Sequence, residues 1–137
     1  MHTDFPDPVV PAINRWGIEK RSPTIGTPEI FFPNAIGNFV SFESTPGHTP
    51  GHISVRIESA GRRAIITGDM AHSPIQIANP ELSSSFDTDP DMARSTRFEA
   101  FERWADGQTL VIGTHFGTPT AGTMHVDGDS YRLETSL

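Results

Sequence analysis

Thr45-Pro46-Gly47-His48 and Thr49-Pro50-Gly51-His52 follow each other directly, so this chain carries the same tetrapeptide twice in succession. The doubled unit lies between two segments that have the alternation of a β-strand, residues 38–44 and 53–59. Each proline fixes its own φ and biases the preceding residue toward extended backbone, and each glycine permits conformations that a Cβ would resist. The sequence therefore predicts a stiff, tightly turned loop that aims an imidazole in one direction.

Two later segments also place a candidate ligand just after a predicted strand. Asp69 follows the apolar run 63–67, and His115 follows the run 109–113. Because loops at one rim of a sheet converge, His48, Asp69 and His115 can meet, and without cysteine a transition-metal site has to use such side chains. Spacing alone leaves open a second interpretation, in which these segments are ordinary turns and the histidines are structural.

The bulk composition restricts the class of protein. A chain of 137 residues suffices for one domain with one core. The net charge of −7 argues against nucleic acid or an anionic membrane surface as a partner. No apolar run approaches the roughly 20 residues of a membrane span, and residues 1–6 do not resemble a signal peptide. The expected location is therefore the cytoplasm.

The chain divides into two parts. Residues 1–37 contain six of the twelve prolines and predict an irregular segment, with a helical turn at 12–16 and an extended piece at 30–32. Residues 38–137 predict an ordered domain. Its clearest helix spans about 90–106, with Asp89 as N-cap, Pro90 at the first position and Arg97 on the polar face. A hairpin over 123–133 should place Met124 opposite Tyr131.

Three motifs, in their order along the chain, resemble the later metal-binding motifs of the metallo-β-lactamase-fold hydrolases. They are the doubled Thr-Pro-Gly-His, Ile65-Ile66-Thr67-Gly68-Asp69 and Val111-Ile112-Gly113-Thr114-His115. The chain is most similar to the lactonase-like and general hydrolase branch, from about residue 38 to the C-terminus. This resemblance implies an α/β fold, the C-terminal half of an αββα sandwich, with mainly one β-sheet and the helix at 90–106. It also implies zinc, two ions per intact member, or iron or manganese in some branches.

The resemblance assigns roles residue by residue. His48 corresponds to a ligand of one metal, Asp69 to the carboxylate that bridges both metals, and His115 to a ligand of the other. His52 corresponds to no ligand and is expected to orient its neighbours. His72 lies where relatives often carry a side chain that faces the substrate, so it is a candidate catalytic residue that polarises a carbonyl; an exposed loop histidine is the alternative.

Two further features of the motif region are less specific. His125 is expected at the surface. Ile75, Ile77 and Phe86, in the loop that follows Asp69, would form either an apolar wall for the substrate or part of the core, and core is the preferred interpretation.

One family motif is missing. The relatives carry a His-x-His-x-Asp-His cluster well upstream, whereas His2 is the only histidine before His48. The resemblance therefore implies a truncated, C-terminal portion in which three ligands remain of a dinuclear site. We expect weak zinc binding and no appreciable hydrolysis by the chain alone, since a catalytic zinc normally has three protein ligands of its own.

The predicted function is metal-dependent hydrolysis of a small-molecule ester- or lactone-type bond, with a metal-bound hydroxide as the nucleophile that the resemblance implies. The alternative is a non-catalytic half-domain that pairs with itself, as a homodimer, or with a separate N-terminal half. A third interpretation, an unrelated small mixed α/β protein, is disfavoured by the ordered motifs. Lactone, ester, thioester, β-lactam and phosphoester substrates all remain open.

Overall fold

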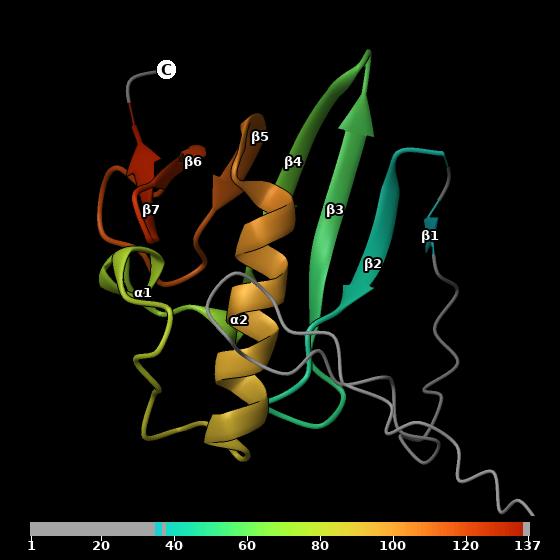
Figure 1. The fold of residues 1–137 in the computed structure, drawn as a ribbon. Helices are drawn as coiled ribbons and strands as arrows, with labels where there is room; N and C mark the ends of the chain where they lie inside the picture. Colours follow the sequence, from blue (N-terminus) through green and yellow to red (C-terminus); the bar gives the residue numbers. More distant parts are fainter. Residues whose placement is uncertain (1–34, 37, 136–137) are drawn as a thin grey trace, which may run out of the picture.

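The computed structural model describes residues 35, 36 and 38–135, which form one seven-stranded sheet with its strands in sequence order (Figure 1). Strands β4 and β5 are parallel and all other neighbours are antiparallel. The strands are β1 (Ala35–Ile36), β2 (Val40–Ser44), β3 (Ile53–Ser59), β4 (Arg62–Ile66), β5 (Asp106–Ile112), β6 (Ala121–Asp127) and β7 (Ser130–Glu134). The predicted mixed α/β architecture is confirmed.

Every helix that the structure describes lies in the connection between β4 and β5. This connection passes through the 3₁₀ turn η1 (Gly68–Met70), the short helix α1 (Ile75–Ala78) and the long helix α2 (Pro90–Trp104). A parallel strand pair requires such a crossover. The crossover brings the chain back to the end of the sheet at which β4 begins, so β5 runs in the same direction as β4. The C-terminal ends of β4 and β5 therefore lie at the same rim of the sheet.

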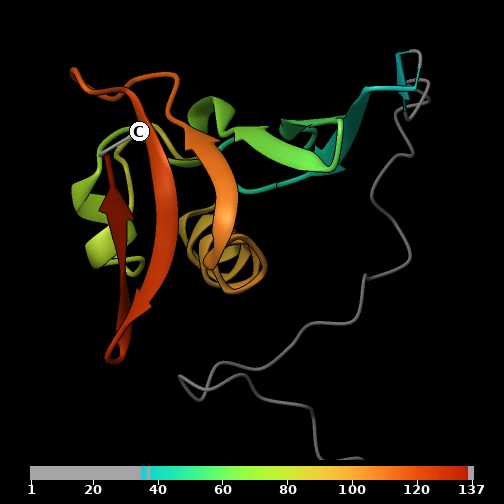
Figure 2. The same ribbon diagram turned by 90° about the horizontal axis from the view of Figure 1, so that it is seen from above.

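Helix α2 lies across one face of the sheet (Figures 1 and 2). The Asp89 side chain accepts a hydrogen bond of 2.9 Å from the Met92 amide, and Pro90 occupies the first turn, as predicted. The helix ends at Trp104 rather than near 106, because β5 already begins at Asp106.

The core lies between α2 and this face of the sheet. Phe101 and Trp104 of α2 pack with ring centroids 6.1 Å apart, and Phe101 meets Tyr131 of β7 edge-on at 5.8 Å. Ile77 is buried in the same cluster, as the core interpretation predicted. Ile75 and Phe86 are instead 58% and 77% exposed, so the core interpretation is wrong for these two.

The opposite face of the sheet is also apolar. Ile65 and Val111 point into the core, so their sequence neighbours point the other way, because side chains alternate along a strand. Through the strand register these neighbours share their face with apolar residues of β2 and β3. We call this set the open face: Val40, Phe42, Ile53, Val55, Ile57, Ala64, Ile66, Leu110 and Ile112. One layer of a two-sheet sandwich presents such a surface to the other.

Two sequence predictions, one about helix α2 and one about the β6–β7 hairpin, are wrong. Arg97 does not lie on a polar face of α2 but is fully buried. Met124 is not opposite Tyr131, because the hairpin turn pairs Asp127 with Ser130 and thereby places Val126 opposite Tyr131. Both side chains are nevertheless buried in the core.

The predictions for residues 1–37 fall, apart from the two residues of β1, outside the described residues. Within the part of the chain that the structure describes, no helix combines the length and the apolar character needed to cross a membrane.

Candidate metal centre

The first Thr-Pro-Gly-His unit is docked on the beginning of α2. Gly47 has φ +133°, and a Cβ there would lie 2.3 Å from Ala93 Cα, so only glycine allows this close approach. The Asp89 amide donates to the Gly47 carbonyl at 2.9 Å, and the Thr88 amide donates to the His48 carbonyl at 3.0 Å. These contacts hold the backbone of His48 against the helix.

The His48 imidazole lies between two carboxylates. Its Nδ1 is 3.2 Å from Asp87 Oδ1, and its Nε2 is 3.5 Å from Asp69 Oδ2. The side chain is only 16% exposed. His48 therefore faces Asp69.

The second Thr-Pro-Gly-His unit contacts the backbone of Asp69 through His52. His52 Nε2 accepts a hydrogen bond of 2.9 Å from the Asp69 amide, so its proton is on Nδ1, which donates to the Thr45 carbonyl at 3.0 Å. Gly68, at φ +59°, leaves room for the ring, since a Cβ there would lie 2.7 Å from His52 Nε2. Burial lowers the pKa of His52, which favours this neutral form.

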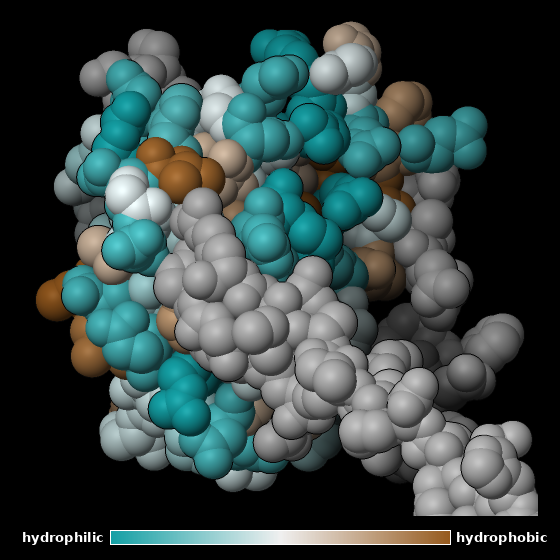
Figure 3. All heavy atoms as spheres, in the orientation of Figure 1, coloured by the Kyte–Doolittle hydropathy of each residue, from teal (hydrophilic) through white to brown (hydrophobic). Residues whose placement is uncertain are grey.

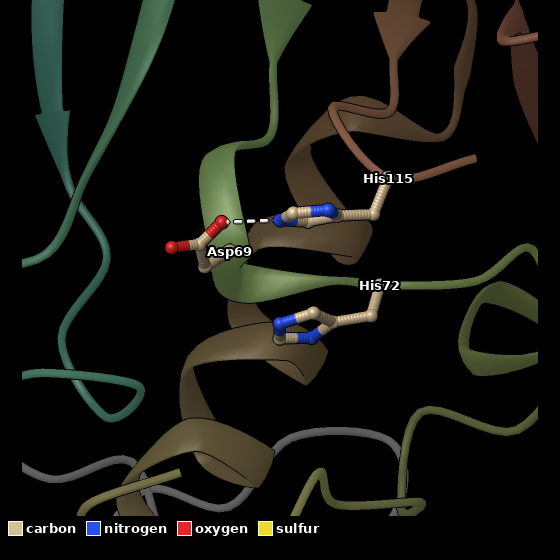
Figure 4. Close-up of side chains that lie close together, drawn as sticks. All are labelled: Asp69, His72 and His115. Atoms are coloured by element: carbon tan, nitrogen blue, oxygen red, sulfur yellow. Dashed lines mark hydrogen bonds and ion pairs between the residues drawn. The ribbon is translucent and has the colours of Figure 1, made fainter. Parts of the chain in front are cut away.

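Asp69 and His115 meet at the rim where β4 and β5 end (Figure 4). His115 Nε2 is 2.6 Å from Asp69 Oδ1. The hydrogen bond from His115, together with the electrostatic interactions with His48 and His115, lowers the pKa of Asp69 despite its partial desolvation. The two oxygens of Asp69 thus face different histidines, Oδ1 toward His115 and Oδ2 toward His48.

His72 lies in the same cluster. Its ring stacks on that of His115, with centroids 4.9 Å apart and an interplanar angle of 16°, and lies 5.3 Å from that of His48. Burial, followed by the charges of His115 and His48, lowers the pKa of His72. Candidate ligand atoms of Asp69, His72 and His115 all lie within 4.8 Å of one another. His125 is elsewhere, with Nε2 3.2 Å from Glu134 Oε2.

The donor set fits a divalent metal. Three imidazoles and a carboxylate are ligands that zinc, iron and manganese accept in the absence of thiolates. Within residues 35–36 and 38–135, His72 Nδ1 is a buried atom without a hydrogen-bond partner, which leaves the polar cluster incompletely satisfied. His48, Asp69, His72 and His115 are therefore the residues that could hold a metal ion.

Sequence reasoning missed Asp87. It lies two residues before the N-cap Asp89, where an acidic residue is common and carries no sign of a site. In the structure its side chain is 1% exposed, in contact with His48 and Arg97. No local pattern marks it, because His48 lies 39 residues away and Arg97 lies on the following helix.

Comparisons with known proteins identify the family and the fold. The model of the metallo-beta-lactamase superfamily matches residues 6–115, which extends upstream of the motif resemblance at residue 38. AidC, described as a dizinc quorum-quenching lactonase in complex with a product, N-hexnoyl-L-homoserine, is 26% identical with a TM-score of 0.68. AbOPH, described as a hydrolase in the beta lactamase superfamily, is 32% identical with a TM-score of 0.67.

The similarity covers much of this chain but a minor part of those proteins. Each alignment spans 74% of this chain and 35% of the other. A probable metal-dependent hydrolase from Staphylococcus aureus shares the fold at 23% identity and a TM-score of 0.60, over 73% of this chain and 37% of its own. A search of curated proteins found no match. Because the family model covers most of its length, the chain belongs to the metallo-beta-lactamase superfamily.

Proposed function

We propose that this chain supplies one side of a metal-dependent hydrolase centre that acts on an ester- or lactone-type carbonyl of a small molecule. The observation that carries the proposal is the convergence of His48, Asp69, His72 and His115 at one rim of the sheet. The similarity to AidC and AbOPH, described as a lactonase and a hydrolase, supports the same class of reaction.

His48, Asp69 and His115 are the proposed metal ligands, with zinc as the metal and iron or manganese as alternatives. Asp69 presents Oδ1 toward His115 and Oδ2 toward His48, so this carboxylate could serve two ions. A bound divalent metal supplies a Lewis acid and lowers the pKa of a bound water. The hydrogen bond that the Asp69 amide donates to His52 Nε2 keeps this carboxylate at the rim.

His72 is the proposed contact to the substrate. Because its pKa is lowered, the imidazole is neutral at neutral pH and can donate one N–H to the carbonyl oxygen as negative charge develops there. A nitrogen of the same ring lies within 4.8 Å of the candidate ligand atoms of Asp69 and His115. Zinc binding by His72→Phe decides between these roles: zinc binding kept at the wild-type level supports substrate contact, whereas zinc binding lost shows that His72 is a ligand.

We propose that the centre is completed by further polypeptide. The chain spans 35% of AidC and of AbOPH, and it lacks the upstream His-x-His-x-Asp-His cluster. The open face offers an apolar surface on which a second sheet, from a second copy or from an N-terminal half, would pack. The expected location in the cytoplasm stays a prediction.

The test is zinc binding by calorimetry and elemental analysis, with hydrolysis assays on lactones, esters and thioesters. The chain alone should bind zinc weakly, lose that binding in His115→Ala, and show no appreciable turnover. Equal zinc binding by wild type and His115→Ala would overturn the assignment of the ligands. Stoichiometric zinc with efficient turnover would show that the chain needs no further ligands.

A further inference from the structure

We propose that Asp87 is a positioning residue which, held by the buried Arg97, fixes the ring orientation and tautomer of His48 so that Nε2 faces Asp69. The claim that this orientation favours metal binding rests on the proposed function. The orientation of the His48 ring follows from contacts within the chain alone.

The Asp87 carboxylate makes polar contacts through both of its oxygens. Its Oδ1 is 3.2 Å from His48 Nδ1, and its Oδ2 accepts a hydrogen bond of 3.0 Å from the Ser84 amide and lies 3.5 Å from Arg97 Nη1. An ionised carboxylate only accepts hydrogen bonds, so His48 Nδ1 must carry the proton and donate it. In the neutral ring this leaves the lone pair on Nε2, the atom that faces Asp69.

Arg97 supplies the counter-charge that holds the Asp87 carboxylate in place. The guanidinium is fully buried, and a buried cation without a counter-charge is costly. Arg97 Nε donates to the Pro80 carbonyl at 3.0 Å, Nη1 to the Met70 carbonyl at 3.3 Å, and Nη2 to Ser83 Oγ at 3.3 Å. One side chain of α2 thus binds the end of η1, at Met70, and two points of the loop that carries Asp87.

The arrangement leaves two acceptors facing each other. With its proton on Nδ1, a neutral His48 presents a lone pair on Nε2 to the Asp69 carboxylate at 3.5 Å. Two such groups repel unless a cation lies between them. The Asp87–Arg97 pair therefore favours the tautomer in which His48 and Asp69 can share a positive ion. In the opposite tautomer, Nε2 would carry the proton and donate it to Asp69, and no ion would be required. Imidazole ligands oriented by a carboxylate in this way recur in metalloproteins.

A purely structural role for the pair makes a different prediction. In that case replacing Asp87 would lower the unfolding free energy but leave the His48 tautomer, and the zinc affinity of the folded fraction, unchanged. The tautomer is thus the readout that separates the two roles, and it can be measured without metal.

The experiment compares the wild-type chain with Asp87→Asn by ¹⁵N chemical shifts of the His48 ring in metal-free protein, then by zinc titration. Wild type should carry the proton on Nδ1. The variant should contain the Nε2-protonated form, because its amide N–H₂ can donate to Nδ1, and its zinc affinity should fall roughly 10–100-fold. Asp106→Asn is the matched control: Asp106 pairs with Arg63 at 2.6 Å, away from the centre, so this change should leave both readouts as in wild type.

The outcomes are separable. An Nε2-protonated His48 in the metal-free wild type overturns the inference, as does an unchanged tautomer in folded Asp87→Asn. The expected tautomer shift with no zinc binding in either protein supports the positioning role and contradicts the proposed metal centre.

If Asp87→Asn does not fold, Arg97→Lys is measured instead. It keeps the charge but loses the fork of donors, so it should loosen Asp87 and yield a mixture of tautomers. A His48 that stays wholly Nδ1-protonated in this variant overturns the role of Arg97.

Discussion

The two Thr-Pro-Gly-His units have the same sequence and opposite roles. In the first, Gly47 packs on α2 and His48 faces Asp69 from a partly buried position. In the second, Gly51 is exposed, and His52 turns inward to bind the Asp69 amide. Identical local chemistry thus produces one candidate ligand and one supporting residue, because different elements pack against the two copies.

The glycines should show the largest difference. Gly47→Ala places a Cβ 2.3 Å from the backbone of Ala93 at a φ of +133°, so it should destabilise the fold by about 3 kcal/mol or more. Gly51→Ala, at an exposed position without positive φ, should change stability by less than about 1 kcal/mol. Denaturant unfolding of both variants measures this. Equal losses would contradict the docking of the first unit on α2.

The histidines should differ in kind. His48→Ala removes a proposed ligand, so zinc affinity should fall by more than the roughly 10–100-fold expected for loss of an outer partner. His52→Ala leaves the Asp69 amide without its acceptor, so the unfolding free energy should drop by about 1–3 kcal/mol while zinc affinity falls less. Zinc titration and urea unfolding test both variants. If His52→Ala weakened zinc as much as His48→Ala, the division of roles would be wrong.

The threonines give a smaller contrast. Thr45 is 1% exposed, and its hydroxyl lies 2.8 Å from His52 Nδ1 and 3.1 Å from Ser54 Oγ. Thr45→Val keeps the shape but removes these bonds, at a cost of about 1–2 kcal/mol. Thr49 is exposed, so Thr49→Val should stay within about 0.5 kcal/mol of wild type. Thermal unfolding at one pH measures the pair, and a neutral Thr45→Val would show that the hydroxyl network contributes nothing.

The smallest effect concerns pH. Burial lowers the pKa of His52 in the folded state, whereas in the unfolded chain this pKa is about 6.5. Below about pH 6.5 the unfolded chain therefore binds more protons than the folded protein. The contribution of His52 to stability is therefore complete above about pH 6.5 and is lost as the pH falls through the folded-state pKa. Metal-free wild type should lose more stability between pH 7 and pH 5 than His52→Gln, which cannot titrate. Parallel curves for the two proteins would contradict this sign.

Much of the fold could be predicted because it depends on near neighbours. The alternation of 53–58 predicted β3, and Asp89 with Pro90 predicted the start of α2. The order of strands, each followed by a ligand, brought His48, Asp69 and His115 to one rim. The prediction that Arg97 lies on the polar face of the helix was wrong. Helical periodicity sorts residues by polarity and cannot show that backbone carbonyls from outside the helix accept the hydrogen bonds of a buried guanidinium.

By itself, the sequence determined where chain direction changes and which side chains with ligand chemistry follow the strands, since proline, glycine and capping residues act within a few positions. Only the tertiary structure decided which imidazole of the doubled unit faces Asp69, and that Asp87 and Arg97 hold it there. Those choices depend on contacts between residues distant in the chain. Two identical tetrapeptides cannot encode such a difference, but the helix against which one of them packs can.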